Sequence, residues 1–133
     1  MNREILFRGK PMFRGSNNFV YGYYKKGAIA GVETDFIFPS PEYKNEINEV
    51  AVLSKTVGLF TGLTDKNGVK IFEGDIIKNI QNGNIGRVTY MPEHCAFLIY
   101  SKAENRYYWL YDNNFGNIEI IGNMYDNPEL LGG

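Results

Sequence analysis

The chain has 133 residues, which is enough for one domain that buries its own core without a disulfide or a metal. Its composition of 44% hydrophobic and 22% charged residues, with a net charge of −1, excludes a disordered chain. A lone cysteine excludes an internal disulfide, and no apolar run reaches the length of a membrane-spanning helix.

Residues that favour strands dominate the composition. Ile, Val, Thr, Phe, Tyr and Trp number 45 together, against 18 for Ala, Leu, Met and Gln. Gly and Asn, which tolerate the backbone of tight turns, contribute 15 each. We therefore predict a mainly β fold, all-β or β-dominated α+β, made of several small antiparallel sheets.

Three strands are expected in the first third of the chain, at residues 4–8, 19–25 and 32–38. Glycines in KKGAIAG provide the turn between the last two. Pro39 and Pro41 then end the third strand, and the polar segment 42–48 is a linker or a short helix. The chain accordingly divides into an N-terminal β-rich subdomain, 1–48, and a C-terminal subdomain, 49–133.

The C-terminal subdomain shows strand signals at short intervals. Asn67-Gly68 and Asn82-Gly83 each lie between extended segments, and a two-residue hairpin turn needs positive φ at both of its positions. Five or six short strands joined by tight turns predict a meander that curls into a small barrel.

The segment RYYWLY, residues 106–111, contains more large side chains than one face of a strand can bury. Alternate residues of a strand point to opposite faces, so Tyr108 and Leu110 are expected in the core. Tyr107, Trp109 and Tyr111 form the other stripe, which we expect to contact the N-terminal strands or a second subunit.

Two long segments resemble the signature segments of the YopX family, a group of small proteins encoded by bacteriophages and prophages. They are TVGLFTGLTDKNGVKIFEGDII (56–77) and IEIIGNMYDNPELL (118–131). REILFRGK (3–10) resembles the opening strand of the family, and VYGYY (20–24) its next aromatic segment. The resemblance implies a β-rich fold with a small C-terminal barrel, in the cytoplasm of a bacterial host cell. It transfers no catalytic, cofactor-binding or metal-binding residue.

The residues of these signature segments are expected to be structural. They are Gly58, Thr61, Gly62, Asp65, Asn67, Gly68, Glu73, Gly74, Asp75, Gly122, Asn123 and Pro128. The glycines suit close packing or positive φ, and the polar side chains can bond backbone groups in turns. The alternative for Glu73 and Asp75 is an acid–base pair, but nothing near them in the sequence supplies a nucleophile.

Pro128 is expected to begin a short helical turn from which Leu130 and Leu131 dock on the barrel. The alternative is that this tail inserts into a neighbouring subunit. His94 and Cys95 are adjacent, so on a strand they point to opposite faces and cannot form a nucleophilic pair. We expect Cys95 to be a buried residue of an apolar strand.

Charge is unevenly distributed along the chain. Residues 1–26 contain six Lys and Arg side chains against one Glu, whereas residues 27–133 contain eight basic and fourteen acidic side chains. Basic residues interleaved with aromatic ones can follow a phosphate backbone and stack bases. The alternative is that this segment packs against acidic surface of its own chain or of a neighbour.

These observations predict a non-enzymatic interaction module that forms homo-oligomers and binds a host or phage protein. We expect no cofactor, no metal and no membrane association. The alternative is a nucleic-acid-binding module that uses the basic N-terminal segment. The residues expected at the interaction surface are Arg3, Arg8, Lys10, Arg14, Tyr107, Trp109 and Tyr111.

Overall fold

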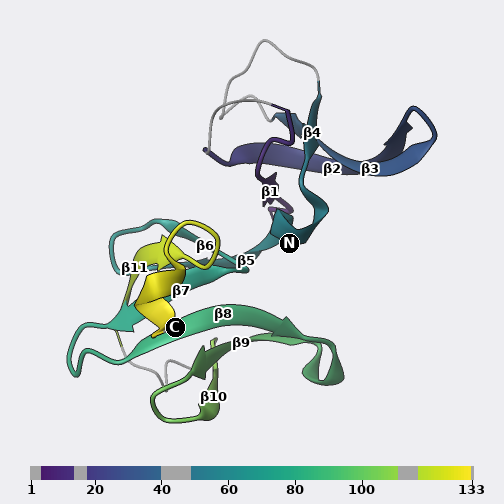
Figure 1. Ribbon diagram of the computed structural model, residues 1–133. Helices are drawn as coiled ribbons and strands as arrows, with labels where there is room; N and C mark the ends of the chain where they lie inside the picture. Colours follow the sequence, from purple (N-terminus) through teal and green to yellow (C-terminus); the bar gives the residue numbers. More distant parts are fainter. Residues whose placement is uncertain (1–3, 14–17, 40–48, 111–116, 133) are drawn as a thin grey trace. The chain divides into compact units, whose positions relative to one another are not determined.

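The computed structural model describes residues 4–13, 18–39, 49–110 and 117–132 (Figure 1). Its strands run antiparallel to their neighbours, and its helical residues form single 3₁₀ turns. The expected mainly β fold with antiparallel sheets is confirmed. No helix among the described residues is long and apolar enough to cross a membrane.

The first compact unit, Met1–Phe60, holds four strands and the start of a fifth. These are β1 (Phe7–Gly9), β2 (Val20–Ile29), β3 (Val32–Pro39), β4 (Val50–Val52) and β5 (Gly58–Thr64). They lie in the order β4-β3-β2-β1-β5, and a 3₁₀ turn, η2 (Ser54–Thr56), precedes β5. One core cluster of this unit contains Ile37, Val50 and Val52, against which Phe7 and Tyr24 pack. Branched aliphatic side chains suit such a core because they fit the pleated surface of a sheet.

The turn between β2 and β3 is the two-residue hairpin turn of this unit. Ile29 pairs with Val32, and the two residues between them, Ala30 and Gly31, have φ of 49° and 81°. Positive φ at both central residues defines a primed turn, whose twist matches that of the flanking strands. The turn expected within KKGAIAG is confirmed.

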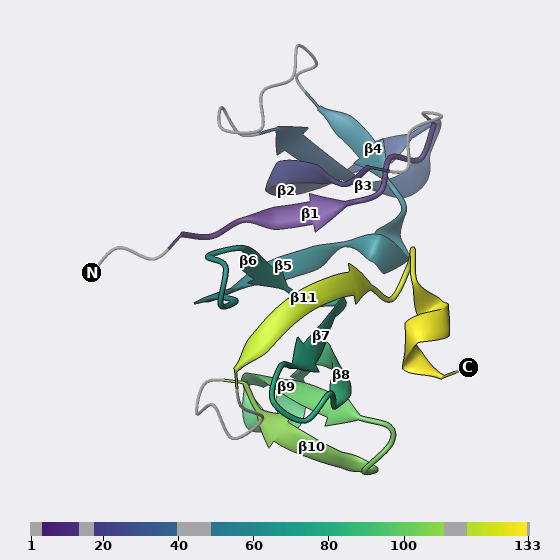
Figure 2. The same ribbon diagram turned by 90° about the vertical axis from the view of Figure 1, so that its left-hand side faces the viewer.

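The second compact unit is Thr61–Gly133. It contains the rest of β5, with β6 (Lys70–Phe72) beside it, and a five-stranded sheet. The strands of that sheet are β7 (Asp75–Asn79), β8 (Ile85–Met91), β9 (Ala96–Ser101), β10 (Arg106–Trp109) and β11 (Ile118–Asn123). Two 3₁₀ turns, η3 (Pro92–His94) and η4 (Pro128–Leu131), complete the unit. Figure 2 shows β8, β9 and β10 side by side, and the tail with η4 after β11.

One face of the five-stranded sheet is buried in the core of the second unit. Ile77, Val88, Ile99 and Leu110 are at most 5% exposed there, and Tyr108 packs against them. The expectation that Tyr108 and Leu110 belong to the core is confirmed. The strand order is β10-β9-β8-β7-β11. Among the described strands no pairing joins β10 to β11, so the sheet is open instead of closing as the expected barrel.

The boundary between the two units lies after Phe60, whereas the sequence places the division after residue 48. Two strand pairings account for the difference. β4 pairs with β3 through Val52 and Asp35, and β5 pairs with β1 through Gly58 and Arg8. The segment 42–48, expected as a linker or short helix, lies outside the described residues.

The two Asn-Gly pairs form longer turns than expected. Gly68 and Gly83 have positive φ, but the asparagines before them do not. In the first turn the N–H of Gly68 donates to the carbonyl of Asp65 at 3.0 Å, and the Asp65 carboxylate accepts the N–H of Asn67 at 2.8 Å. The carboxylate therefore stabilises a turn in which only the last residue needs positive φ. The expectation of positive φ at both positions of each pair is wrong.

Candidate interaction surface

Two of the four described cations of the basic N-terminal segment, Arg8 and Lys10, lie against one aromatic ring of their own chain. Arg8 and Lys10 are 4% and 8% exposed. The guanidinium carbon of Arg8 is 4.0 Å from the centre of the Phe19 ring, and the Lys10 ammonium is 4.2 Å from it. Such contacts stabilise a cation through the negative face of the ring. Arg3 and Arg14 lie outside the described residues.

Asp65, a residue of the first signature segment, connects two distant parts of the second unit. Its carboxylate accepts backbone N–H groups of Asn67, Val69 and Ile120 at 2.8, 3.0 and 3.0 Å. Burial opposes the charged form, but these three donations hold the pKa of Asp65 below its ordinary value. The charged carboxylate thus fastens the hairpin of β5 and β6 to β11.

The EGD tract forms a tight turn between β6 and β7. The Asp75 carboxylate, which is 2% exposed, accepts the N–H of Phe72 at 2.7 Å. Gly74 has a φ of 96°, donates its N–H to Val88 and accepts the N–H of Met124, both at 2.9 Å. These contacts give Asp75 and Gly74 structural roles, which supports the structural interpretation of the tract over an acid–base pair.

The second signature segment shapes the tail. A Cβ on Gly122 would lie 2.5 Å from Oδ1 of Asn127, so only glycine leaves room for that side chain. Asn127 Oδ1 accepts the N–H of Asn123 at 3.2 Å, and Asn123 Oδ1 accepts those of Tyr125 and Asp126, each at 3.0 Å. Pro128 then begins the expected helical turn, η4. Thus the tail adopts one defined path across the sheet.

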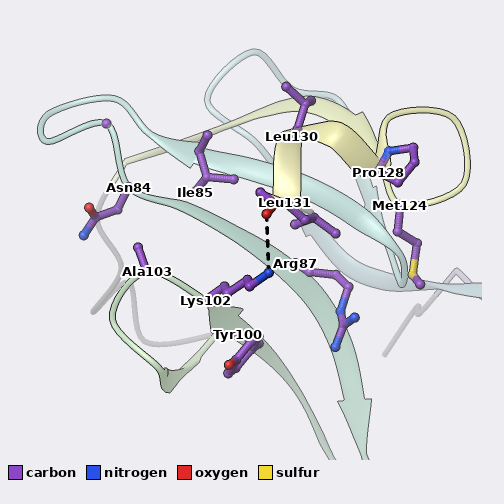
Figure 3. Close-up of a pocket in the computed structure, with 12 residues that line it drawn as sticks. Asn84, Ile85, Arg87, Tyr100, Lys102, Ala103, Met124, Pro128, Leu130 and Leu131 are labelled. Atoms are coloured by element: carbon purple, nitrogen blue, oxygen red, sulfur yellow. Dashed lines mark hydrogen bonds between the residues drawn. The ribbon is translucent and has the colours of Figure 1, made fainter.

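A pocket of about 810 Å³ lies between this tail and the sheet face opposite the core (Figure 3). Strand alternation and the pairing of Arg87 with Tyr100 place Ile85, Arg87 and Tyr100 on this face. Opposite them, the tail supplies apolar side chains: Met124, Pro128, Leu130 and Leu131. The turn after β9 contributes Lys102 and Ala103. The pocket is mainly apolar and open on one side.

The charged side chains that line this pocket are both basic. They are Arg87 and Lys102, and no Asp or Glu side chain is among the lining residues. The guanidinium of the half-buried Arg87 makes no hydrogen bond or ion pair with the part of the chain that the structure describes. Lys102 donates to the carbonyl of Gly132 at 3.5 Å, the dashed line in Figure 3. Among the described residues, therefore, no acidic side chain that lines the pocket compensates its positive charge.

A row of aromatic side chains extends from the pocket to the edge of the sheet. Tyr100 pairs with Arg87 on one side and with Tyr107 on the other, and the two tyrosine ring centres are 4.9 Å apart. Tyr107 is 47% exposed. Trp109, two residues further along β10, faces the same way and contacts the ring of His94 at 5.3 Å. Tyr111, the last residue of the expected stripe, lies outside the described residues.

We call Arg87, Tyr100, Lys102, Tyr107 and Trp109 the aromatic–basic surface. The sequence predicts two of its five residues, Tyr107 and Trp109, from their alternation with core residues. It does not indicate Arg87, Tyr100 or Lys102, because only the registers of β8 with β9 and of β9 with β10 bring these residues near the sheet face of Tyr107.

His94 and Cys95 are arranged differently from the expectation. His94 is the last residue of η3, Cys95 follows it as the C-cap, and β9 begins only at Ala96. Cys95 has a φ of 50° and is exposed, with its Sγ 3.7 Å from the Pro92 carbonyl oxygen. The expected burial of Cys95 in a strand is wrong, because Pro92 begins a helical turn that delays the strand. Across the described ranges, no three His, Cys, Asp or Glu side chains are grouped to hold a metal ion.

Comparison with known proteins gives a family match and matches among the solved structures. A family model described as "YopX protein" matches residues 17–132, which include both long signature segments but not REILFRGK. No curated protein matches the chain. The crystal structure of protein EF1440 from Enterococcus faecalis is 24% identical in sequence, with a TM-score of 0.42. The alignment covers 98% of this chain and 99% of that one.

Proposed function

Because this chain belongs to the YopX family, we propose that it is a phage- or prophage-encoded accessory protein that acts by binding another protein. It works in the cytoplasm of the bacterial host and catalyses no reaction. Homo-oligomers form through the same surface, so a second copy of the chain is one of its partners. Asp75 and Gly74 do not favour the acid–base alternative for the EGD tract, since their contacts hold a turn together.

The observation that carries this proposal is the aromatic–basic surface. Tyr, Trp and Arg are the residues that most often dominate the free energy of binding at protein interfaces. Here all three residue types share one sheet face, and Tyr107 exposes 47% of its surface. β10 is also an end strand in the order of the described sheet. A polypeptide partner can pack against the rings on this side of the sheet.

The nucleic-acid alternative gains no support from the described part of the N-terminal segment. Affinity for nucleic acid comes mainly from cations that reach phosphates at the surface. Arg8 and Lys10 are buried and lie over the Phe19 ring. Lys25 and Lys26 are exposed, and the Lys26 ammonium lies 3.8 Å from the Glu33 carboxylate and 3.9 Å from that of Asp35. We therefore retain the protein-binding function alone.

Site-specific photo-crosslinking tests this proposal. A photoreactive phenylalanine analogue replaces Tyr107 in one variant and Tyr23, which is 57% exposed in the first unit, in a matched control. Both variants are expressed in the bacterial host and irradiated. We expect one defined adduct, with a second copy or with another protein, from position 107 only. Equal labelling at both positions, or none at position 107, contradicts the proposal.

A further inference from the structure

The pocket beside the aromatic–basic surface has chemistry of its own, and we propose that it binds a short peptide segment with an apolar side chain next to a carboxylate. This inference rests on the proposed function, because the segment belongs to the protein partner. The apolar side chain occupies the space under the tail, and the carboxylate pairs with Arg87 and Lys102.

The size and walls of the pocket fit such a segment. Its volume of about 810 Å³ lies in the range of small-ligand sites, roughly 300–1,000 Å³. Met124, Leu130 and Leu131 are half-buried and form an apolar wall, opposite Ile85 on the sheet. Figure 3 shows the leucines on the tail, with Arg87 and Lys102 extending from the sheet side. One open side lets a peptide backbone continue out of the pocket, which an enclosed cavity does not allow.

The positive charge of the side chains that line the pocket favours the binding of an anionic group. Arg87 is free of hydrogen bonds and ion pairs with the described residues, and its planar guanidinium can donate two parallel N–H bonds to one carboxylate. Within the described residues, Lys102 makes one long hydrogen bond of 3.5 Å to a neutral carbonyl, and a carboxylate is a stronger acceptor for it. The nearest carboxylates in the tail sequence, Asp126 and Glu129, are exposed and do not line the pocket.

The aromatic row favours a peptide over other anions. Tyr100 lines the pocket and its ring contacts that of Tyr107 on β10, the end strand of the described sheet. A peptide anchored in the pocket can therefore continue over Tyr107. A nucleic acid needs a longer series of cations to neutralise its phosphates.

Methyl-detected NMR with a matched peptide pair tests this inference. The probes are acetyl-Ala-Leu-Asp-Ala-amide and the nearly isosteric acetyl-Ala-Leu-Asn-Ala-amide, and octanoate serves as a lipid-like anion. We expect the Asp peptide to shift the methyl signals of Ile85, Met124, Leu130 and Leu131. We expect it to bind about five-fold more tightly than the Asn peptide, as one partly exposed ion pair allows.

Two variants show whether the difference depends on the pocket. Arg87→Gln, which leaves Lys102 as the one cation lining the pocket, should reduce the difference between the two peptides to about two-fold or less. Lys78→Gln, which removes an exposed cation of β7 outside the lining, should preserve the five-fold difference. Equal binding of both peptides, tighter binding of octanoate, or a folded Arg87→Gln variant that keeps the five-fold preference overturns the inference. If these results occur while crosslinking from position 107 persists, the pocket assignment fails and the protein-binding function stands.

Discussion

Two buried carboxylates, Asp35 and Asp65, depend on hydrogen-bond donors that are separated from them in sequence. The hydroxyl of Tyr24 donates to Asp35 at 2.6 Å across the β2–β3 hairpin. That bond, reinforced by burial, raises the pKa of Tyr24 to about 12. The same bond, acting against burial, lowers the pKa of Asp35. A single hydrogen bond thus changes the titration of both groups, and each change affects stability.

The Tyr24–Asp35 bond predicts a stability change at each end of the pH range. Its contribution through Tyr24 is complete below pH 10.0, the ordinary pKa, and is lost as pH rises from there to about 12. Its contribution through Asp35 is present above pH 3.8 and is lost as the carboxylate protonates below that value. Tyr24→Phe should lower the free energy of unfolding near pH 7 by about 1 kcal/mol and flatten the alkaline decline.

Urea unfolding between pH 3 and pH 11.5 checks this prediction. Tyr23→Phe is the matched control, because this neighbouring tyrosine is 57% exposed and makes no hydroxyl hydrogen bond with the described residues. The control should unfold like the wild type at every pH. An alkaline decline of equal steepness in Tyr24→Phe would show that other groups cause it.

We expect Asp65→Asn to lower the free energy of unfolding by more than Tyr24→Phe does. The amide keeps one acceptor oxygen but turns an NH₂ group towards backbone N–H groups that now bond the carboxylate. We expect the free energy of unfolding to fall by about 2–3 kcal/mol, the magnitude for lost bonds to a buried charge. Thermal and urea unfolding measure it, with the exposed Glu93→Gln as the control, which should change stability by less than about 0.5 kcal/mol. A loss no greater than that of Glu93→Gln contradicts the role assigned to Asp65.

Among the elements, the β2–β3 hairpin contains a residue that does not suit its own backbone. Ala30 adopts a φ of 49°, which costs an ordinary side chain about 1 kcal/mol, whereas Asn tolerates it. Ala30→Asn should therefore raise the free energy of unfolding by about 0.5–1 kcal/mol. Ala28→Asn, two residues earlier on the strand, should give no gain because strands disfavour Asn. Chemical denaturation of the wild type and of the two variants measures these free energies of unfolding. Equal values for the wild type and Ala30→Asn would count against the primed turn.

Most strands could be predicted from the sequence because their signals are local. Alternation and β-branched residues locate β2 and β3, and Pro128 locates η4. The turn at Asn67-Gly68 could not be predicted in detail, since its geometry depends on Asp65. That carboxylate is fixed by the N–H of Ile120, which is 55 residues away in sequence. The expected barrel depends likewise on a pairing between distant strands that local patterns cannot reveal.

On the scale of the whole molecule, the aromatic–basic surface predicts self-association. Light scattering at increasing concentration should show an oligomer for the wild type. Tyr107→Ala should weaken it about ten-fold or more, as truncation of an interface tyrosine commonly does. Tyr23→Ala, which removes a similarly exposed ring from the first unit, should leave the oligomer unchanged. A wild-type monomer at all concentrations, or equal effects of both variants, excludes self-association through this surface.

The candidate site could be predicted only in part. The stripe of Tyr107 and Trp109 follows from strand alternation, but Arg87 and Lys102 are 15 residues apart and lie on either side of a turn and a strand. Only the register of β8 with β9 brings Arg87 beside Tyr100. The tail that lines the pocket opposite these cations follows β11 in the chain, and its path depends on the space left at Gly122.

The tail has a consequence for the thermodynamics of binding. An occupant that requires the apolar wall can bind only those molecules in which the tail is docked, so its apparent affinity is reduced by that fraction. Reciprocally, occupancy must slow hydrogen exchange at the Leu130 and Gly132 amides, which bond Asn127 and Glu129 within the tail. Gly122 therefore affects the affinity from outside the pocket, because a side chain at this position would shift the docking equilibrium of the tail without contacting the occupant.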